Sequence, residues 1–180
     1  MKNKYEIRGE TTAIFLNRRN GDILETLIDT ADLDKAKRFP NTWCAAWSDD
    51  TQSFYCYGKL YFPNKAIIIK LHRWLTNCPK GLEVDHYNND TLDNRRSKNL
   101  RIANHNENQQ NRFNACRNSK SGIRGVWLHK GHKKWQAQIR LNNKIKHLGY
   151  FDSIKDAETA VKRARSIYMP FSKEASLWNI

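Results

Sequence analysis

The sequence predicts an α+β protein that combines small antiparallel sheets with two short strand–helix units. Three observations lead to this fold class. Short β-rich runs are separated by turn residues, two helix starts carry capping signals, and the charge changes sharply along the chain. The expected parts are a small N-terminal antiparallel sheet (1–70), a strand–strand–helix unit (71–112), a basic linker (113–121), a three-stranded sheet with one helix (122–172) and a tail (173–180).

The first 70 residues are rich in β-forming side chains. Two runs at 11–17 and 22–28 flank Asn20-Gly21, which is a strong hairpin signal. Further strands are expected at 43–47, 53–62 and 65–70. Aromatic side chains in these runs suit a half-buried sheet, and core packing is favoured over stacking on bases. The region is therefore expected to be a scaffold that leads into the next unit.

The stretch from Glu83 to Asn111 organises the middle of the chain. Runs at 83–86 and 99–103 predict two short strands joined by a polar loop. Asn104 then suits a helix N-cap, and Glu107 stands three residues later, as in a reciprocal capping box. The order strand, loop, strand, helix places Asp85 and His86 at the end of the first strand. Asn108 then lies about one turn into the helix.

These polar residues suit metal-assisted hydrolysis of a phosphodiester. The Asp85 carboxylate and the Asn108 amide oxygen are hard ligands of the kind that Mg²⁺ prefers. A neutral His86 imidazole beside them can accept a proton from water near neutral pH. Taken singly, each residue is more often a polar strand end or a helix cap than a catalytic group. The chemistry is indicated by the combination.

The same residues resemble the HNH endonuclease motif of phage and intron homing nucleases. The resemblance lies in Asp85-His86, Asn99-Leu100 and Glu107-Asn108, with Leu71-His72-Arg73 similar to the lead-in of that family. It implies a ββα-metal nuclease fold that uses Mg²⁺ or Mn²⁺. The implied roles are general base for His86, metal ligands for Asp85 and Asn108, and a loop-holding residue of the catalytic site for Asn99.

Three further residues of this unit have expected places. Arg95 and Arg96 lie in the loop between the strands and are expected to contact phosphates beside the scissile bond. His72 is expected either near the metal site or in a structural role, and the sequence favours neither. These expectations complete the candidate active site.

Charge is distributed unevenly along the chain. The net charge of +14 comes from 32 Lys and Arg against 18 Asp and Glu. Residues 1–94 hold 13 of each sign, whereas residues 95–180 hold 19 basic and 5 acidic side chains. This excess favours a polyanionic partner. Basic ribosomal or lipid-binding proteins show such asymmetry too, so charge alone does not select DNA.

Cysteine usage and hydropathy narrow the class further. The four cysteines are scattered, and the absence of a Cys-x-x-Cys pair disfavours a zinc knuckle. No stretch approaches transmembrane length, and no apolar signal core follows the N-terminus. We therefore expect reduced cysteines, a cytoplasmic location and no membrane partner.

The C-terminal third predicts a three-stranded sheet covered by a helix. Strands are expected at 123–128, 134–140 and 144–148, with turns at Gly131 and Asn142-Asn143. The middle strand alternates cleanly, with 135, 137 and 139 on one face and the polar residues on the other. Asp152-Ser153 then opens an amphipathic helix. The open face of the sheet is basic and amide-rich, which suits a DNA groove.

This part resembles the Apetala-type DNA-binding domain of plant ethylene-response factors. The resemblance rests on runs 121–126, 135–140 and 147–151. Matching positions and the basic linker give the expected DNA-contacting set: Arg117, Lys120, Arg124, Trp127, His129, Lys134, Gln136, Gln138, Arg140, Lys146 and His147. Trp127 and His129 replace arginines of that family, so its target sequence does not transfer.

Together the two resemblances imply a site-recognising, Mg²⁺-dependent DNA endonuclease of the homing type, in a bacterial or phage-infected cell. With one active site and no heptad pattern, we expect a monomer that nicks one strand of double-stranded DNA. Two other readings stay open. One is a DNA-binding regulator with an inactive nuclease unit, and the other is a basic RNA-binding accessory protein.

Overall fold

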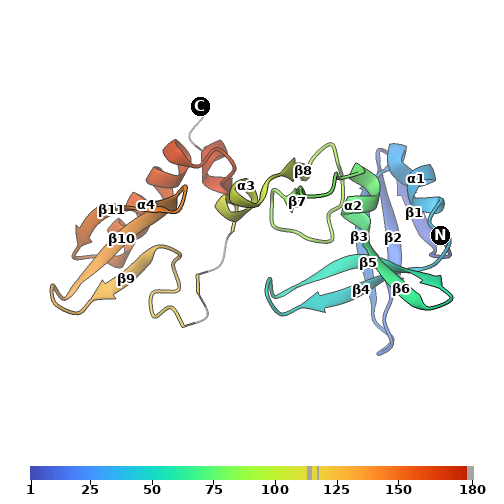
Figure 1. The fold of residues 1–180 in the computed structure, drawn as a ribbon, viewed down its shortest axis with the longest axis horizontal. Coiled ribbons are helices and arrows are strands. Elements are labelled where there is room, and N and C mark those ends of the chain that lie inside the picture. The colour runs from blue at the N-terminus through green and yellow to red at the C-terminus, as the bar shows by residue number, and fades with distance from the viewer. Residues whose placement is uncertain (113–114, 117, 178–180) are drawn as a thin grey trace. The chain divides into compact units, whose positions relative to one another are not determined.

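The computed structural model describes residues 1–112, 115–116 and 118–177. The chain forms two compact units, residues 1–104 and 105–180 (Figure 1). Several small antiparallel sheets and few helices confirm the expected α+β class. Within the described part of the chain, no helix is long and apolar enough to cross a membrane.

The first unit contains two three-stranded antiparallel sheets where the sequence predicted one. Their strands are β1 (Tyr5–Arg8), β2 (Thr11–Asn17) and β3 (Ile23–Asp29) in one sheet, and β4 (Trp43–Ser48), β5 (Ser53–Phe62) and β6 (Lys65–Lys70) in the other. The 3₁₀ helix η1 (Thr30–Asp32) and α1 (Leu33–Lys37) separate β3 from β4. This helical segment therefore lies between the two sheets in the chain.

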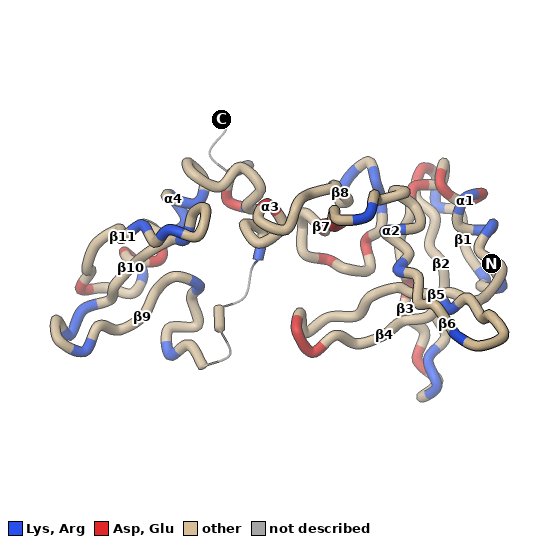
Figure 2. The backbone as a smooth tube through the Cα atoms, in the orientation of Figure 1, with Lys and Arg blue, Asp and Glu red and all other residues tan. Residues whose placement is uncertain are grey.

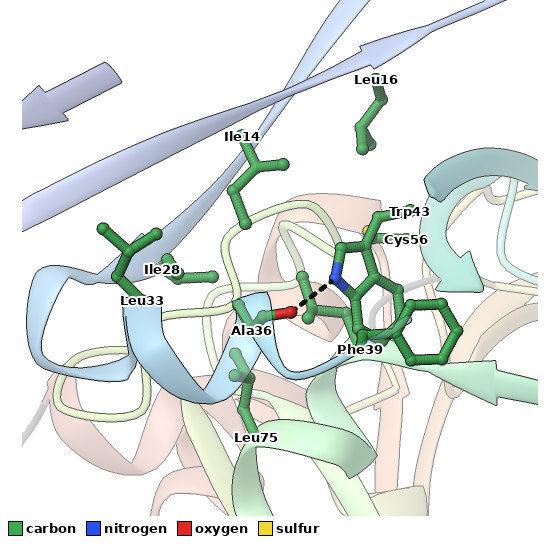
Figure 3. Packing of buried hydrophobic residues seen from close by; sticks show 10 residues of the cluster. Ile14, Leu16, Ile28, Leu33, Ala36, Phe39, Trp43, Cys56 and Leu75 are labelled. Carbon is green, nitrogen blue, oxygen red and sulfur yellow. Dashed lines mark hydrogen bonds between the residues drawn. The ribbon is translucent and has the colours of Figure 1, made fainter. Parts of the chain in front are cut away.

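The core of the first unit lies around α1 and the aromatic pair that follows it (Figure 3). The ring of Phe39 stacks on Trp43 with centroids 4.0 Å apart. The Trp43 indole Nε1 donates to the Ala36 carbonyl oxygen at 3.4 Å. Helix α2 (Leu71–Thr76) adds the fully buried Leu71 and Leu75 to the same core. The helix that leads into the candidate active site is thus anchored in the N-terminal scaffold.

A hairpin with a long connecting loop completes the first unit. Strand β7 (Glu83–His86) pairs antiparallel with β8 (Leu100–Ala103), and His86 stands opposite Leu100. The loop between them is bonded to β3: Leu27 N donates to Leu92 O at 2.9 Å, and Asn94 N donates to Leu27 O at 2.7 Å. The hairpin therefore shares one unit with the two sheets, and the expected boundary at residue 70 is not a division of the structure.

The second unit begins with α3 (His105–Gln110), one residue after Asn104. The chain therefore divides before α3, whereas the sequence placed the linker at 113–121. The remaining elements are β9 (Val126–His129), β10 (Lys134–Leu141), β11 (Lys144–Phe151), α4 (Ile154–Tyr168) and the 3₁₀ helix η2 (Lys173–Leu177). The strands form an antiparallel sheet in the order β11-β10-β9. Ser153 caps α4 by accepting from Lys155 N at 3.1 Å, as its position before the helix predicted.

One face of this sheet packs on α4. Ala137 and Ile139 of β10 are buried against Ala157 and Val161 of the helix. The pairing of β10 with β11 contains a bulge, because Ala137 is opposite Gly149 while Gln138 is opposite His147. The extra residue on β11 changes which of its side chains face the helix. Gly149 adopts a φ of +132° at this irregularity.

We expect Gly125→Ala to destabilise the second unit. Gly125 has a φ of +86°, and an added Cβ would lie 2.4 Å from the backbone oxygen of Gln138. Because Gln138 N donates to Gly125 O at 2.9 Å, the two segments cannot separate without losing that bond. The free energy of unfolding should fall by about 1–3 kcal/mol, the range for overpacked sites. Urea denaturation followed by far-UV circular dichroism measures it.

Gly122→Ala is the matched control, because Gly122 also has a positive φ of +66° but nothing lies within 4 Å of its added Cβ. It carries the backbone strain without the clash. Equal losses of stability in the two variants would show that strain alone, and not the close approach to Gln138, decides the cost.

Candidate active site

The end of β7 holds the two residues that the motif singled out. Asp85 and His86 are 7% and 5% exposed. Asp85 stands opposite Arg101 of β8, and the guanidinium binds one carboxylate oxygen, Oδ2, at 2.8 Å from Nε and 2.7 Å from Nη2. Arg101 also lies over the ring of Tyr87, 5.0 Å from its centroid. The buried carboxylate is therefore charge-compensated across the hairpin.

His86 is held by the loop between the strands. Its Nε2 lies 3.3 Å from Oδ1 of the buried Asn94. Burial lowers the pKa of His86, although the Asn94 hydrogen bond and nearby carboxylates act in the opposite direction. A lowered pKa favours the neutral imidazole near pH 7. A neutral ring is the form that can accept a proton from water.

A second histidine lies against the first. The rings of His72 and His86 meet edge to face, with centroids 5.0 Å apart, and Tyr55 contacts both at about 6 Å. Burial, followed by the neighbouring His86, lowers the pKa of His72 to about 2. His72 is therefore neutral near pH 7 and forms part of the wall of the site. The sequence had left its place open, and the structure puts it beside the candidate base.

Asn99 ties the loop together by side-chain-to-backbone bonds, as expected from the sequence. Its Nδ2 donates to the carbonyl oxygens of Asp93 at 2.7 Å and Asp90 at 3.1 Å, and its Oδ1 accepts from Asn88 N at 2.8 Å. Asn99 is itself 3% exposed. Three bonds from one buried amide fix the path of the loop that carries Asn94.

The two loop arginines, Arg95 and Arg96, bind carboxylates within the first unit. Arg95 binds Asp93 through Nε at 2.7 Å and Nη2 at 2.6 Å. Burial acts to raise the pKa of the Asp93 carboxyl, but the hydrogen bonds from Arg95 outweigh it, so the pKa is lowered. Arg96 forms a bidentate pair with Asp32 of η1, both bonds at 2.6 Å. Both guanidinium groups thus stabilise the loop. The sequence had predicted phosphate contacts for them and not this structural role.

Asn108, the other expected metal ligand, lies half-buried in α3. Helix α3 belongs to the second unit, whereas Asp85 and His86 belong to the first. Among the described residues, no group of three or more His, Cys, Asp or Glu side chains is arranged to hold a metal ion. Mg²⁺ needs only one or two protein ligands, with water and phosphate in its other positions. A carboxylate–amide pair fits that ion by its chemistry.

The open face of the C-terminal sheet carries most of the expected DNA-contacting residues. Residues directly opposite one another share a face, and the register opposes Trp127 to Gln136, His129 to Lys134, and His147 to Gln138. Arg140 follows on the same side of β10 and is exposed. A partner can therefore contact the side chains of this set from one side of the sheet. Figure 2 marks the lysines and arginines along β10, β11 and α4.

Lys146 is the exception on β11. It stands opposite Ile139, whose side chain is buried against α4, so Lys146 lies on the helix side of the sheet. Its Nζ lies 3.7 Å from the centroid of the Tyr168 ring near the end of α4. The bulge before Gly149 had no sequence signal that fixed its position, so the alternation alone could not show this.

Arg124 also has a contact that the sequence did not reveal. Its guanidinium donates to the last carbonyl oxygens of α3, to Gln109 at 3.0 Å and Gln110 at 3.2 Å, and to the oxygen of Arg112. Burial lowers its pKa to about 10. Arg124 therefore caps α3 within the second unit. Lys120 is exposed, and Arg117 lies outside the described residues.

The open face also holds an aromatic cluster. The sequence had predicted His129 and His147 on this face, but not Tyr150 or His132. Tyr150 contacts His129, His132 and His147, with ring centroids 5.3, 4.5 and 4.8 Å apart. His132 lies in the turn between β9 and β10, and its backbone N donates to His129 Nδ1 at 3.2 Å. The cross-strand position of Tyr150, opposite Gln136, is the signal that would have placed it here.

Comparison with known proteins bears on the first of these sites. Residues 76–110 match the model of a family described as HNH endonuclease. The matched span contains Asp85, His86, Asn99 and Asn108, and it supports an HNH-type nuclease, a DNA hydrolase at the level of the family. No curated protein matches the chain. No solved structure matches it either.

We expect His72 to make the protein sensitive to acid. Its pKa of about 2 in the folded chain lies below the ordinary value of 6.5, so between these pH values the unfolded chain binds a proton that the folded chain does not. The free energy of unfolding should therefore fall as the pH drops below about 6.5, by at most about 1.4 kcal/mol per pH unit for this one group. In His72→Leu, urea unfolding at pH 7, 6 and 5 should show a shallower slope.

His147→Gln serves as the control, because His147 is exposed on β11. Its slope should match that of the unchanged chain. A His72→Leu slope as steep as that of the control would contradict the assignment of acid sensitivity to His72.

Proposed function

We propose that the protein is a metal-dependent DNA endonuclease of the HNH homing type, which cuts one strand at a recognised site. The observation that carries the proposal is a buried His86 of lowered pKa next to Asp85, inside the segment that matches the HNH endonuclease family. Groups whose pKa is shifted by burial and by a neighbouring charge gather at active sites, and a neutral imidazole of this kind can act as a general base. The chain order β7, β8 and α3 corresponds to the strands and helix of the proposed ββα-metal unit.

In this proposal His86 accepts the proton of the attacking water. The resulting hydroxide attacks phosphorus and the bond to the 3′ oxygen breaks. That oxygen takes a proton from solvent water, so the products carry 5′-phosphate and 3′-hydroxyl ends. Asp85 and Asn108 would hold the Mg²⁺ or Mn²⁺ ion, which when bound stabilises charge on the leaving oxygen. Arg101 binds Asp85 at 2.7 Å and would share that carboxylate with the ion. Arg96, whose side chain is 48% exposed, would remain available to a phosphate at the edge of the site.

The second unit supplies the proposed recognition of double-stranded DNA. Residues 105–180 carry 15 Lys and Arg against 5 Asp and Glu, whereas residues 1–104 carry 17 against 13. The open sheet face presents Gln136, Gln138 and Arg140 side by side on β10. Glutamine can pair with adenine and arginine with guanine in the major groove. This arrangement supports an Apetala-type mode of binding. In this proposal the protein also acts as a monomer in the cytoplasm of the host cell.

Plasmid cleavage tests the proposal. In a supercoiled plasmid library with random inserts, the members that carry a recognised site should be converted to open circle by the protein in Mg²⁺. Linear product should be absent or late, because one active site cuts one strand per docking. His86→Ala should slow nicking by about 10²–10⁴-fold, the usual contribution of a general base. Gel electrophoresis of the products measures both. The control is Thr12→Val, which changes a buried side chain of β2 and leaves all four motif residues and the open sheet face in place.

Three outcomes would count against this function. Near-normal nicking by His86→Ala would contradict the role of His86 as general base. Immediate linear product from a dimer would contradict the cutting of one strand by a monomer. DNA binding without any cleavage would favour the reading as a regulator with an inactive nuclease unit.

Arg140 should contribute to sequence preference in the full chain. Arg140 is exposed on the open sheet face, whereas Lys162 is exposed on α4 and pairs with Glu158 at 2.7 Å. Arg140→Ala should relax preference among targets, and one lost base contact corresponds to about 1–3 kcal/mol. Lys162→Ala, the matched loss of one charge, should weaken all sequences equally or not at all. Selection of bound fragments from a random DNA pool distinguishes the two, and unchanged preference in Arg140→Ala would exclude the sheet face as the reader.

A further inference from the structure

A chain of buried hydrogen bonds runs from His86 into the N-terminal sheet. His86 Nε2 lies 3.3 Å from Asn94 Oδ1, Asn94 Nδ2 lies 2.8 Å from Thr26 Oγ1, and Thr26 Oγ1 lies 2.8 Å from Leu92 O. Thr26 belongs to β3 and is 0% exposed, and Asn94 is 1% exposed. Thr26 is far from the motif in sequence, so no pattern within 76–110 includes it.

The direction of each bond in this chain is fixed by its last acceptor. Leu92 O is a carbonyl and only accepts, so Thr26 must donate its hydroxyl proton to it. The Thr26 oxygen then accepts from Asn94 Nδ2, which also donates to Leu92 O at 3.3 Å. The amide of Asn94 therefore turns its oxygen toward His86. An amide oxygen only accepts, so Nε2 of His86 must carry the proton.

We propose that Thr26 and Asn94 are positioning residues that hold His86 as the Nε2–H tautomer, so that Nδ1 is the atom that takes the proton from water. The tautomer follows from the hydrogen bonds, and its catalytic meaning rests on the proposed nuclease function. When Nδ1 accepts the proton, the ring becomes an imidazolium whose Nε2–H still donates to Asn94 Oδ1. The bond becomes charge-assisted and stronger as the proton moves.

The alternative arrangement is disfavoured by the same contacts. A flipped Asn94 would place its oxygen beside both Leu92 O and Thr26 Oγ1. The single hydroxyl proton of Thr26 cannot serve both oxygens, so one buried acceptor would be left unpaired. Edge-to-face contact with His72, at 5.0 Å between centroids, and with Tyr55, at 5.9 Å, restricts rotation of the His86 ring. Hydrogen bonding thus selects the tautomer, and packing selects the ring orientation.

The tautomer is tested on the full chain without DNA or metal. Nitrogen-15 NMR of histidine-labelled protein distinguishes protonated from unprotonated ring nitrogens, and His86→Gln identifies the His86 signals among the six histidines. In the unchanged chain at neutral pH, Nε2 should be protonated and Nδ1 unprotonated. In Asn94→Leu and Thr26→Val the His86 signals should move toward a mixture of tautomers. Thr26→Ser keeps the hydroxyl and should restore the signals of the unchanged chain.

Kinetics provide the second readout. The substrate is one plasmid recovered from the nicked fraction of the library. For its nicking in Mg²⁺, kcat should fall about tenfold in Thr26→Val, the effect of about one lost hydrogen bond, and up to about 10²-fold in Asn94→Leu, with KM unchanged. Thr12→Val is the matched control. Thr12 is 0% exposed on neighbouring β2, and its hydroxyl bonds Thr30 at 3.0 Å, away from His86. Its tautomer signals and its kcat should be those of the unchanged chain.

The outcomes separate this inference from the proposed function. If His86 is protonated at Nδ1 in the unchanged chain, or if Thr26→Val and Asn94→Leu leave its signals unchanged, the positioning role is excluded whether or not the protein cuts DNA. If the tautomer shifts as expected but the unchanged chain never nicks DNA, the positioning stands and the nuclease function fails. A loss of kcat in Thr12→Val equal to that in Thr26→Val would assign the effect to general destabilisation and overturn the catalytic part.

Discussion

The candidate active site depends on hydrogen bonds between β3 and the loop that joins β7 to β8. Leu27 N and O each bond that loop, at Leu92 O and Asn94 N, and the adjacent Thr26 side chain bonds it again. A loop of this length has high conformational entropy on its own. Its attachment to a strand of a packed sheet sets where Asn94 lies, and Asn94 contacts His86. The N-terminal scaffold is therefore part of the device that orients the candidate base.

Charge is organised differently in the two units. In the first unit, Asp85, Asp93 and Asp32 are each buried and each bound by an arginine at 2.6 to 2.7 Å. Removing one partner of such a pair leaves an uncompensated buried charge, so these pairs fix the geometry more than they add net stability. The second unit carries its excess of Lys and Arg with few acidic partners. One unit thus suits precise placement of reacting groups, and the other suits attraction to a polyanion.

The sequence revealed interactions between residues that are close along the chain and missed those between residues far apart along it. Strand alternation and the motif placed Asp85, His86 and Asn99, because their positions follow from a hairpin of adjacent strands. Thr26 could not be found, since its bond to Asn94 joins residues 68 apart. The sequence predicted Lys146 on the open face, whereas the structure has it on the helix side. A bulge reverses the alternation of β11, and a bulge has no fixed sequence signal. The division before α3 was likewise invisible, because it follows from packing and not from composition.

The aromatic cluster on the C-terminal sheet narrows where base recognition can occur if that face binds DNA as we propose. The ring of Tyr150 on β11 reaches His129 on β9, so the two contact each other across β10 near its start. Rings that pack on one another present a flat surface and few free hydrogen-bonding groups. Gln138, Arg140 and His147 lie toward the other end of the sheet, where His147 stands opposite Gln138. Direct readout would therefore concentrate at the end of β10, while the aromatic cluster would contact sugar or base edges through its apolar surface.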